Sequence, residues 1–454
     1  MNLSRSKNFN VNYAAKIVNI QEFHSHSNPE VTKLKCCKVD GFNVITGIDS
    51  KPGLYIYFPV ECCIDKEFLS KNNLFRDASM NVNHSETGMF EDKGRVKAIK
   101  LKGEISEGFV IPIESLNYFI DDHPIVVDNS EVGIDFDTVY EKLLCKKYVP
   151  KYQRTPGTSS SKQGKQPKKK ADVECLEGQF HYHVDTTLLK KCPYVIKPDS
   201  LISITAKVHG TSGISANVMI KKQLPKSFFD KIMRRQKYIE EYHSFCSSRK
   251  VIQDPILNER VSGYYGGSDV AGRNEIHNLL FGSLPKGMSV YYEILGYWPN
   301  GAPIQGKWDY GFEKPESPSK WKYGKNYGVE VYRITYTNLD GVVYEFSARQ
   351  VQQFCEKAGW TPVEQYYYGY AKNLYPDLDV TNHWNDNFVE CLSKDKRFNM
   401  EMYSPRCINK VPHEGIVIRN ESLNIDVYKL KCFAFLEKER AALDKGEFDI
   451  EAEQ

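Results

Sequence analysis

Short runs in which apolar and polar side chains alternate dominate the first part of the chain. Turn signals such as Asp40-Gly41 and Lys51-Pro52-Gly53 separate these runs. Six of them have the length and composition of strands: 15–20, 33–39, 43–48, 54–58, 95–101 and 107–113. Many short strands divided by tight turns are typical of a small β-barrel, which the pattern predicts here. Residues 137–144 are expected to form a helix.

Alternation returns at residues 201–206 and ends at a lysine. Ile202, Ile204 and Ala206 alternate with polar residues, so Lys207 is expected on the open face of a strand. Gly210 to Gly213 follow, and then a second alternating strand over 214–220. The pattern predicts a hairpin with Lys207 at its rim. Such a lysine can be a surface charge, a phosphate-binding group or a nucleophile.

The later strands carry charged side chains where a buried strand would not need them. Strands are expected at 288–295, 329–336, 411–420 and 425–435. Glu293 interrupts an apolar strand, and an unpartnered acid there is costly, so a ligand hydroxyl or a basic partner is expected beside it. Lys429 and Lys431 are two residues apart and therefore project from one face. Two such charges repel each other unless an anion lies between them.

Between these parts lies a basic, low-complexity segment. Residues 151–170 are rich in Lys, Gly, Ser and Pro and contain no acid. This composition is typical of a flexible linker, which can be a solvated tether, a contact for nucleic-acid phosphates or a nuclear address. The predicted domains are 1–150, a linker at 151–175, and 176–454. Residues 225–245, with Phe229, Ile232, Met233, Ile239 and Tyr242, are expected to form an inserted helix.

Composition narrows the class of protein. The 454 residues, 41% of them hydrophobic, suffice for two or three soluble domains. No signal peptide or apolar membrane span is present, so an intracellular protein, cytoplasmic or nuclear, with no membrane partner is expected. Twelve cysteines without a CxxC pair indicate reduced thiols. A net charge of +3 does not by itself indicate nucleic-acid binding.

A second basic cluster lies within the predicted barrel. Its members are Arg95, Lys97, Lys100 and Lys102. Lysines that protect an edge strand would produce this pattern, and so would a groove that follows a phosphate backbone.

Six ordered motifs give the chain a family resemblance. Residues 207–210, KVHG, have the form of motif I (K-x-x-G) of the covalent nucleotidyltransferases. The residues that match the later motifs follow in the family's order: Arg249, Glu293, Tyr332, Glu414 and the pair Lys429 and Lys431. Together with GEISEGFVIP and HVDTT…TAKVHGTS, they make the chain similar to ATP-dependent RNA ligases of the Deinococcus and Naegleria type, which carry an N-terminal OB domain.

The resemblance implies an α+β fold and an activity. An N-terminal OB-type β-barrel would precede a nucleotidyltransferase domain of antiparallel sheets with flanking helices. The implied enzyme uses ATP and Mg²⁺ or Mn²⁺ to join 3′-OH and 5′-phosphate ends, at nicks in duplexes, through a lysyl-AMP and an adenylated 5′ end. RNA or an RNA-containing nicked duplex would be the partner of a monomeric enzyme.

The resemblance also implies roles for single residues. Lys207 would be the nucleophile. Lys429 and Lys431 would bind the α-phosphate, and their positive charges would favour loss of the proton from Lys207. Glu414 would help to hold the metal ion. The remaining assignments are Glu293 to the ribose hydroxyls, Tyr332 to adenine, Arg249 to the end phosphate, and His209 with Gly210 to the nucleotide-binding turn.

Two other classes of protein use parts of this pattern. A GTP-dependent mRNA-capping guanylyltransferase shares the core motifs but is expected to carry its OB domain after the last one, whereas here the strand-rich part comes first. A non-catalytic OB-type nucleic-acid-binding protein is the second alternative, although it would not need to retain Lys207 or the lysine pair.

Overall fold

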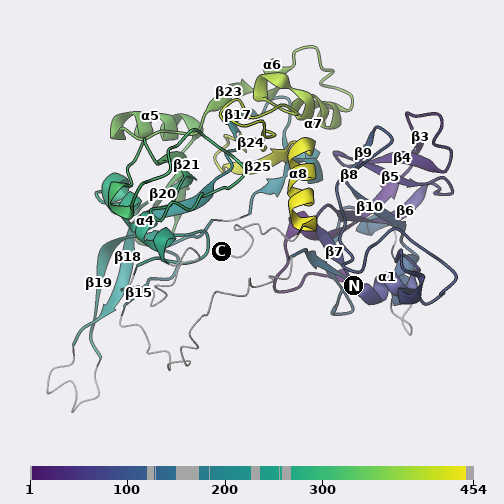
Figure 1. Cartoon of the computed structure of the whole chain (residues 1–454), viewed down its shortest axis with the longest axis horizontal. Helices are drawn as coiled ribbons and strands as arrows, with labels where there is room; N and C mark the ends of the chain where they lie inside the picture. Colours follow the sequence, from purple (N-terminus) through teal and green to yellow (C-terminus); the bar gives the residue numbers. More distant parts are fainter. Residues whose placement is uncertain are drawn as a thin grey trace.

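A computed structural model of the chain describes residues 3–119, 127, 129–149, 173–183, 185–225, 236–254, 256–257 and 267–445. Figure 1 shows two lobes, the N-lobe (residues 3–149) and the C-lobe (residues 173–445), with helix α8 (Phe433–Asp444) beside both. The basic segment at 151–170 lies outside the described residues. No helix in the described ranges is long and apolar enough to cross a membrane.

The N-lobe consists of short antiparallel strands around an apolar core. Its largest sheet has the order β10 (Gly108–Pro112), β6 (Gly53–Pro59), β2 (Ala15–Ile20) and β11 (Asp135–Phe136). The smaller sheets are β3 (His24–Ser25), β4 (Leu34–Val39) and β5 (Phe42–Gly47); β8 (Ile99–Leu101) and β9 (Glu104–Ser106); β7 (Cys62–Ile64) and β14 (Cys145–Lys147); and β1 (Leu3–Ser4), β12 (Thr138–Val139) and β13 (Lys142–Leu143).

Helices α1 (Lys66–Lys71) and α2 (Ser115–Phe119) cover the N-lobe core, where Phe58, Phe68 and Phe136 are buried. The six strands predicted in this lobe are present, although only residues 99–101 of the fifth form a strand. The described residues form separate sheets rather than one closed barrel, so an OB-type barrel stays a prediction.

The C-lobe contains two sheets flanked by helices. One joins β15 (Val173–Cys175), β18 (Thr211–Gln223), β20 (Met288–Gly296), β21 (Tyr327–Thr337) and β22 (Val343–Glu345), with β19 (Tyr238–Ser247) also paired to β18. The other has the order β16 (Thr187–Leu188), β25 (Asp426–Lys431), β24 (Gly415–Asn420), β17 (Leu201–Ala206) and β23 (Gln365–Tyr370). The other helices are α4 (Ser268–Ile276), α5 (Ala348–Ala358), α6 (Ala371–Leu374) and α7 (Trp384–Lys394).

This mixed architecture of sheets and flanking helices agrees with the predicted fold class. Among the named strands of the described residues, the pairings are antiparallel except for β16 with β25, which is parallel. Twelve free cysteines, most of them buried, agree with the expectation of reduced thiols.

The predicted hairpin around Lys207 is wrong, and the difference matters for function. Strand β17 pairs with β23 and β24, whereas β18 pairs with β15, β19 and β20. The alternating pattern and the glycines fit a crossing between two sheets as well as they fit a hairpin, because both need only two strands and a tight connection. Lys207 therefore lies where the chain passes from one sheet to the other.

Three other expectations about elements are corrected. Residues 138–143 form the hairpin β12–β13 instead of a helix, because Tyr140 and Glu141 both adopt positive φ, as a tight turn between strands requires. Residues 238–247 form strand β19, which pairs with β18 over its whole length; residues 226–235 of the expected inserted helix lie outside the described part. The last predicted strand ends at Lys431, and α8 begins at Phe433.

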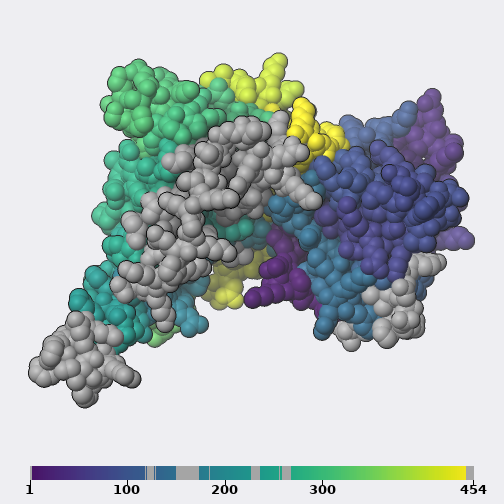
Figure 2. Space-filling model, turned by 60° about the horizontal axis from the view of Figure 1, so that its bottom comes forward, coloured from purple at the N-terminus to yellow at the C-terminus, as the bar shows by residue number. Residues whose placement is uncertain are grey.

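Helix α8 joins the two lobes through ion pairs. Asp444 lies 3.0 Å from Arg95 and 3.1 Å from Lys97, and Arg440 donates a hydrogen bond to the carbonyl of Ala98. Arg95 also forms a bidentate pair with Glu61 at 2.7 and 2.6 Å. Arg95 and Lys97 therefore have carboxylate partners and do not line an open basic groove. In Figure 2 the yellow atoms of the C-terminal part lie between the green C-lobe and the blue N-lobe.

Breaking the buried part of this contact should destabilise the protein. The Arg95 side chain is 2% exposed, so Arg95→Met leaves the Glu61 carboxylate without its cation in a largely buried position. We expect a loss of about 3 kcal/mol in the free energy of unfolding, measured by urea denaturation. Lys97→Met is the matched control, because its partners are half-exposed and its loss should be below about 1 kcal/mol. Equal losses in the two variants would contradict this account.

Candidate active site

A cavity of about 500 Å³ lies between the lobes where the two C-lobe sheets meet. Eight of the nine residues predicted for the site line it: Lys207, His209, Arg249, Glu293, Tyr332, Glu414, Lys429 and Lys431. The ninth, Gly210, lies directly behind the wall and donates its N–H to Glu293 Oε1 at 3.1 Å. The structure thus brings together residues that are up to 224 positions apart in the sequence (431 − 207).

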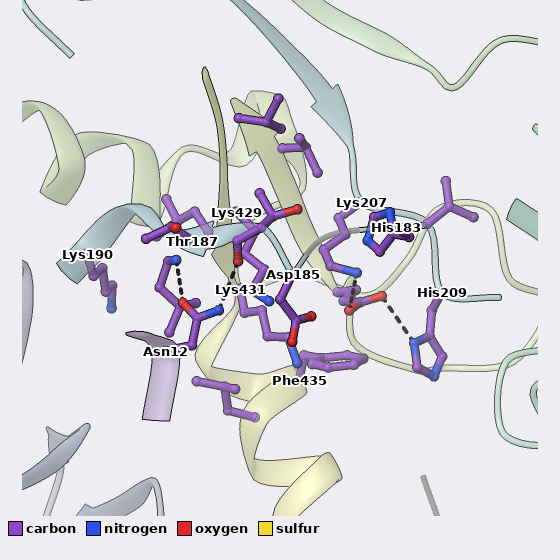
Figure 3. Close-up of a pocket in the computed structure, with 18 of the residues that line it drawn as sticks. Asn12, His183, Asp185, Thr187, Lys190, Lys207, His209, Lys429, Lys431 and Phe435 are labelled. Carbon is purple, nitrogen blue, oxygen red and sulfur yellow. Dashed lines mark hydrogen bonds and ion pairs between the residues drawn. The ribbon is translucent and has the colours of Figure 1, made fainter. Parts of the chain in front are cut away.

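Lys207 is held by a buried carboxylate. Its Nζ lies 2.7 Å from Glu414 Oε1, and His209 Nδ1 lies 3.1 Å from Glu414 Oε2, as the dashed lines in Figure 3 show. Burial alone would raise the pKa of the Glu414 carboxyl, but the charge of Lys207 and the contact with His209 outweigh it and hold that pKa well below its ordinary value. Glu414 is therefore ionised at neutral pH, and it stabilises the protonated form of Lys207.

The position of Glu414 depends on the glycine that follows it. Gly415 has φ +140°, and a Cβ there would lie 2.1 Å from the carbonyl oxygen of Leu430 in β25. The Gly415 carbonyl accepts the N–H of Lys207 at 2.9 Å, and the Glu414 carbonyl accepts the N–H of Cys432 at 3.0 Å. The start of β24 thus fixes the lysine and the end of β25 in one hydrogen-bonded unit.

Gly210 allows a second close approach. A Cβ at this position would lie 2.4 Å from the carbonyl oxygen of Ile294, so only glycine lets the connection after Lys207 pass this close to β20. The same contact brings the Gly210 N–H to Glu293. The fold therefore requires a glycine at the last position of the KVHG motif, because a side chain there would collide with β20.

Aromatic residues that the sequence analysis did not identify hold His209. Its ring centroid lies 4.1 Å from that of Trp308 and 5.2 Å from that of Phe435 in α8. The Tyr310 hydroxyl donates a hydrogen bond to the backbone carbonyl of His209 at 3.0 Å and accepts one from the backbone N–H of His209 at 3.1 Å. The imidazole is consequently fixed against Glu414. No sequence motif marks Trp308 or Tyr310, because they come from an irregular loop.

Lys429 and Lys431 project into the cavity from one face of β25, as predicted, while Leu430 is buried on the other face. Lys431 Nζ lies 3.2 Å from Glu439 of α8. Lys429 forms no ion pair with any residue that the structure describes. Burial, followed by repulsion from Lys431, lowers the pKa of Lys429 to about 8 despite the nearby Asp185. This pair of lysines is suited to binding an anion.

The opposite side of the cavity carries the groups expected to contact a nucleoside. Glu293 is buried in β20, where it accepts hydrogen bonds from the Gly210 N–H and, at 3.4 Å, from the Ser212 hydroxyl. Tyr332 in β21 has its hydroxyl 3.3 Å from His183 Nδ1. The acid in an apolar strand thus accepts hydrogen bonds from the Gly210 N–H and the Ser212 hydroxyl, and a carboxylate here is a suitable acceptor for hydroxyl donors of a ligand.

Arg249 lies near these groups and is paired with a residue to which the sequence gave no role. Its guanidinium forms an ion pair with Asp185, which also accepts a hydrogen bond from Asn10 of the N-lobe at 3.0 Å. Burial would raise the pKa of Asp185, but Arg249 and Lys429 lower it to about 2. Burial lowers the pKa of neighbouring His183 to about 3, so its ring is neutral. His183 and Asp185 both belong to the HVDTT segment (residues 183–187), and this segment is the only sequence signal that could have pointed to them as site residues.

The N-lobe holds this segment in place. Asn12 accepts the Leu188 N–H at 2.9 Å and donates to the Thr186 carbonyl at 3.1 Å. Lys191 is buried and donates to the carbonyls of Val11 and Ala14, and its ammonium lies 3.0 Å from Asp135. Strand β16 in turn pairs with β25, with Leu188 opposite Lys429. Contacts from the N-lobe therefore extend to the lysine pair.

The residues around Glu414 fit a divalent cation that keeps most of its water. The described residues contain no cluster of three or more His, Cys, Asp or Glu side chains of the kind that encloses a metal. Glu414 is a single buried carboxylate with both oxygens directed toward cationic or imidazole groups. Mg²⁺ ordinarily binds through one or two carboxylates, water and substrate phosphates, and this site offers such a carboxylate.

Comparison with solved structures gives a likeness over nearly the whole chain. No protein-family description matches the chain, and no curated protein sequence matches it. Structures of Naegleria gruberi RNA ligase are similar over nearly the whole chain. A mutant with AMP and Mn has TM-score 0.54 and 14% identity, covering 94% of this chain and 99% of that one; the enzyme with PPi has TM-score 0.51 and 16% identity, covering 94% and 99%. An apo mutant has TM-score 0.53 and 15% identity, covering 95% and 100%. This chain therefore has the overall fold of Naegleria gruberi RNA ligase.

Proposed function

We propose that this protein is an ATP-dependent RNA ligase that joins 3′-OH and 5′-phosphate ends through an adenylate on Lys207. The observation that carries the proposal is the convergence of Lys207, Glu414, Glu293 and the pair Lys429 and Lys431 on one cavity. A lysine beside two further cations and a buried carboxylate is arranged for nucleotidyl transfer, whereas a simple binding surface would not need it. The fold of an RNA ligase supports the same assignment.

In the first step the Lys207 amine attacks the α-phosphorus of ATP. The ammonium first loses one proton to solvent; a nitrogen–phosphorus bond then forms, the bond from the α-phosphorus to the bridging oxygen breaks, pyrophosphate leaves, and the nitrogen loses a second proton to solvent. Lys429 and Lys431 would bind the charge that develops on the α-phosphate. Glu293 would accept the ribose hydroxyls, Tyr332 would stack on adenine, and the turn at His209 and Gly210 would border the nucleotide.

A divalent cation is part of the proposal, with Glu414 as its protein ligand, directly or through water. When bound, Mg²⁺ or Mn²⁺ would neutralise charge on the phosphates of ATP. Glu414 also forms an ion pair with Lys207, which favours the charged form of that amine before ATP binds. A cation attracted to this carboxylate would weaken its hold on Lys207 and favour the neutral amine.

The later steps use the adenylate to join RNA. A 5′-phosphate oxygen would attack the adenylate phosphorus and release Lys207, and the 3′-OH would then attack the activated 5′-phosphorus and release AMP. We propose Arg249 as a contact for the end phosphate. We further propose residues 1–150 as an OB-type platform for nucleic acid and residues 176–454 as the adenylyltransferase domain. RNA would be the partner of a monomeric, intracellular enzyme.

The first test is covalent labelling. Incubation with labelled ATP and Mg²⁺ or Mn²⁺ should attach AMP to the protein, and chelation of the metal should prevent it. Lys207→Arg should lower labelling by more than about 1,000-fold, because a guanidinium keeps the charge beside Glu414 but does not lose its proton. Exposed Lys197→Arg is the control. A labelled Lys207→Arg protein would refute the proposal, and labelling by GTP in place of ATP would favour a capping enzyme.

The second test concerns the sugar at the end that is joined. The 2′-OH distinguishes RNA from DNA at a single nucleotide, and a duplex held by both lobes would align the two ends. We expect a nick with a terminal 3′ ribose to be sealed at least about tenfold faster than one with a terminal deoxyribose, and faster than free single strands. Matched nicked duplexes that differ only in this sugar measure the effect. Equal sealing rates would argue against an RNA ligase.

A further inference from the structure

Strands β18 and β19 form a long two-stranded ribbon, the β18–β19 ribbon, that leads away from the cavity. They pair from Ile214 with Ser247 to Gln223 with Tyr238, which corresponds to a length of about 30 Å. In Figure 1 the outer half of the ribbon extends beyond the rest of the C-lobe, on the side away from the N-lobe. Adenylate chemistry at Lys207 does not need an extension of this length.

The inner end of the ribbon reaches the cavity. Ser212 near the start of β18 lines the cavity, and so does Arg249, two residues after the end of β19. The ribbon therefore runs outward from the arginine that is the proposed contact for the end phosphate. The N-lobe lies on the other side of the cavity (Figure 1). A duplex with its nick at the cavity would thus have the N-lobe on one side and the ribbon on the other.

One face of the ribbon is used within the protein. Val218 is buried there in a small apolar core, and His243 lies 2.8 Å from Asp254. Farther out on the same face, Lys222 forms an ion pair with Glu241 at 3.4 Å. Because successive side chains of a strand point to opposite faces, the neighbours of these residues belong to the second face.

The second face carries cations held over aromatic rings. Its outer part consists of Met219, Lys221, Gln223, Tyr238, Glu240 and Tyr242. Lys221 Nζ lies 4.6 Å from the ring centroid of Tyr238, and Lys286 Nζ, from the exposed loop before β20, lies 5.3 Å from that of Tyr242. Tyr238 is 48% exposed. The rings position the two ammonium groups, which remain accessible to a ligand.

The charge of this face indicates an anionic partner. Neither Lys221 nor Lys286 forms an ion pair with any residue that the structure describes, although Glu240 is opposite Lys221 in the ladder. Over residues 221–241 the sequence has seven basic and three acidic residues, a net charge of +4, whereas the whole chain carries +3. Lysine ammonium groups and tyrosine hydroxyls are the donors that bind a phosphate backbone without reading its sequence. A nucleic acid therefore fits this face.

We propose that the β18–β19 ribbon binds the flank of a nicked duplex on the side that carries the 5′-phosphate. Lys221 and Lys286 contact phosphates of its backbone, and the hydroxyls of Tyr238 and Tyr242 donate hydrogen bonds to it. A length of about 30 Å matches about nine base pairs at the spacing of a B-form duplex. The inference rests on the proposed function for the identity of the nucleic acid and of the end, while the direction and charge of the ribbon do not depend on it.

Binding of a nicked RNA duplex without ATP tests the proposal. Fluorescence anisotropy on the full chain gives the dissociation constant at several salt concentrations. Lys221→Gln combined with Lys286→Gln should weaken binding about tenfold and lower the slope of log affinity against log salt by about 2, because two phosphate contacts are lost. Lys222→Gln is the matched control on the opposite face of the ribbon. It should change the affinity less than about twofold and leave the slope unchanged.

Shortening the duplex on one side at a time locates the contact. On the 5′-phosphate side, a reduction from about 15 to about 5 base pairs should weaken binding to the wild-type protein about tenfold and have little effect on the double variant. Shortening the 3′-OH side should affect the two proteins equally. If the double variant binds like the Lys222→Gln protein, or if it remains as sensitive as the wild type to the length of the 5′-phosphate side, the proposal is wrong.

These measurements need no catalysis, so the two proposals can fail separately. Lys221 and Lys286 do not line the cavity, and the double variant should take up the AMP label as the wild-type protein does. A protein that binds the duplex through the ribbon but takes no label would refute the ligase assignment alone. A labelled protein whose binding is insensitive to both lysines would refute the role of the ribbon alone.

Discussion

The ion pair between Lys207 and Glu414 is the interaction on which the rest of the site depends. It links the end of β17 to the start of β24, and the Glu414 and Gly415 carbonyls extend the link to Cys432 and to the backbone of Lys207. A buried carboxylate needs such partners, because an isolated charge in this position would be very costly. The negative charge of Glu414 at 2.7 Å favours the charged form of the Lys207 amine. In the proposed reaction, a competitor for Glu414 would make it easier for Lys207 to lose its proton, and Glu414 would supply a carboxylate ligand for a divalent cation that neutralises phosphate charge.

The second constraint is that both lobes contribute to one cavity. Helix α8 begins directly after the strand that carries Lys431, holds that lysine through Glu439, and reaches the N-lobe through Asp444. From the other side, Asn12 fixes the strand that pairs beside Lys429. A movement of the N-lobe would therefore change the positions of Lys429 and Lys431. A substrate that binds both lobes can thus affect the geometry of the reaction centre without touching it.

The sequence located the residues that line the cavity better than it located their surroundings. Lys429 and Lys431 were placed correctly because a strand has a fixed period of two, and Glu293 because a charge in an apolar strand is conspicuous. The crossing at Lys207 was misjudged because strand pairing is decided by distant partners such as β20 and β24, which no local pattern reveals. Asp185 and Trp308 were missed for the same reason. Their importance depends on the residues that lie opposite them in the fold. Residues 138–143 were predicted wrongly for a different reason: they form a tight turn between two strands, which their local helix propensity did not indicate.

The central claim is that Lys207, although ion-paired at rest, is the lysine that receives AMP. Lys429 is the strongest rival, since it has no carboxylate partner among the described residues and its lowered pKa leaves more of its amine neutral. Peptide mapping by mass spectrometry of the wild-type protein, after incubation with ATP and a divalent cation under acid-free conditions, distinguishes the two. The account predicts the added mass of one AMP on the peptide that contains Lys207 and none on the peptide that contains Lys429. AMP on Lys429, or on neither peptide, would contradict it.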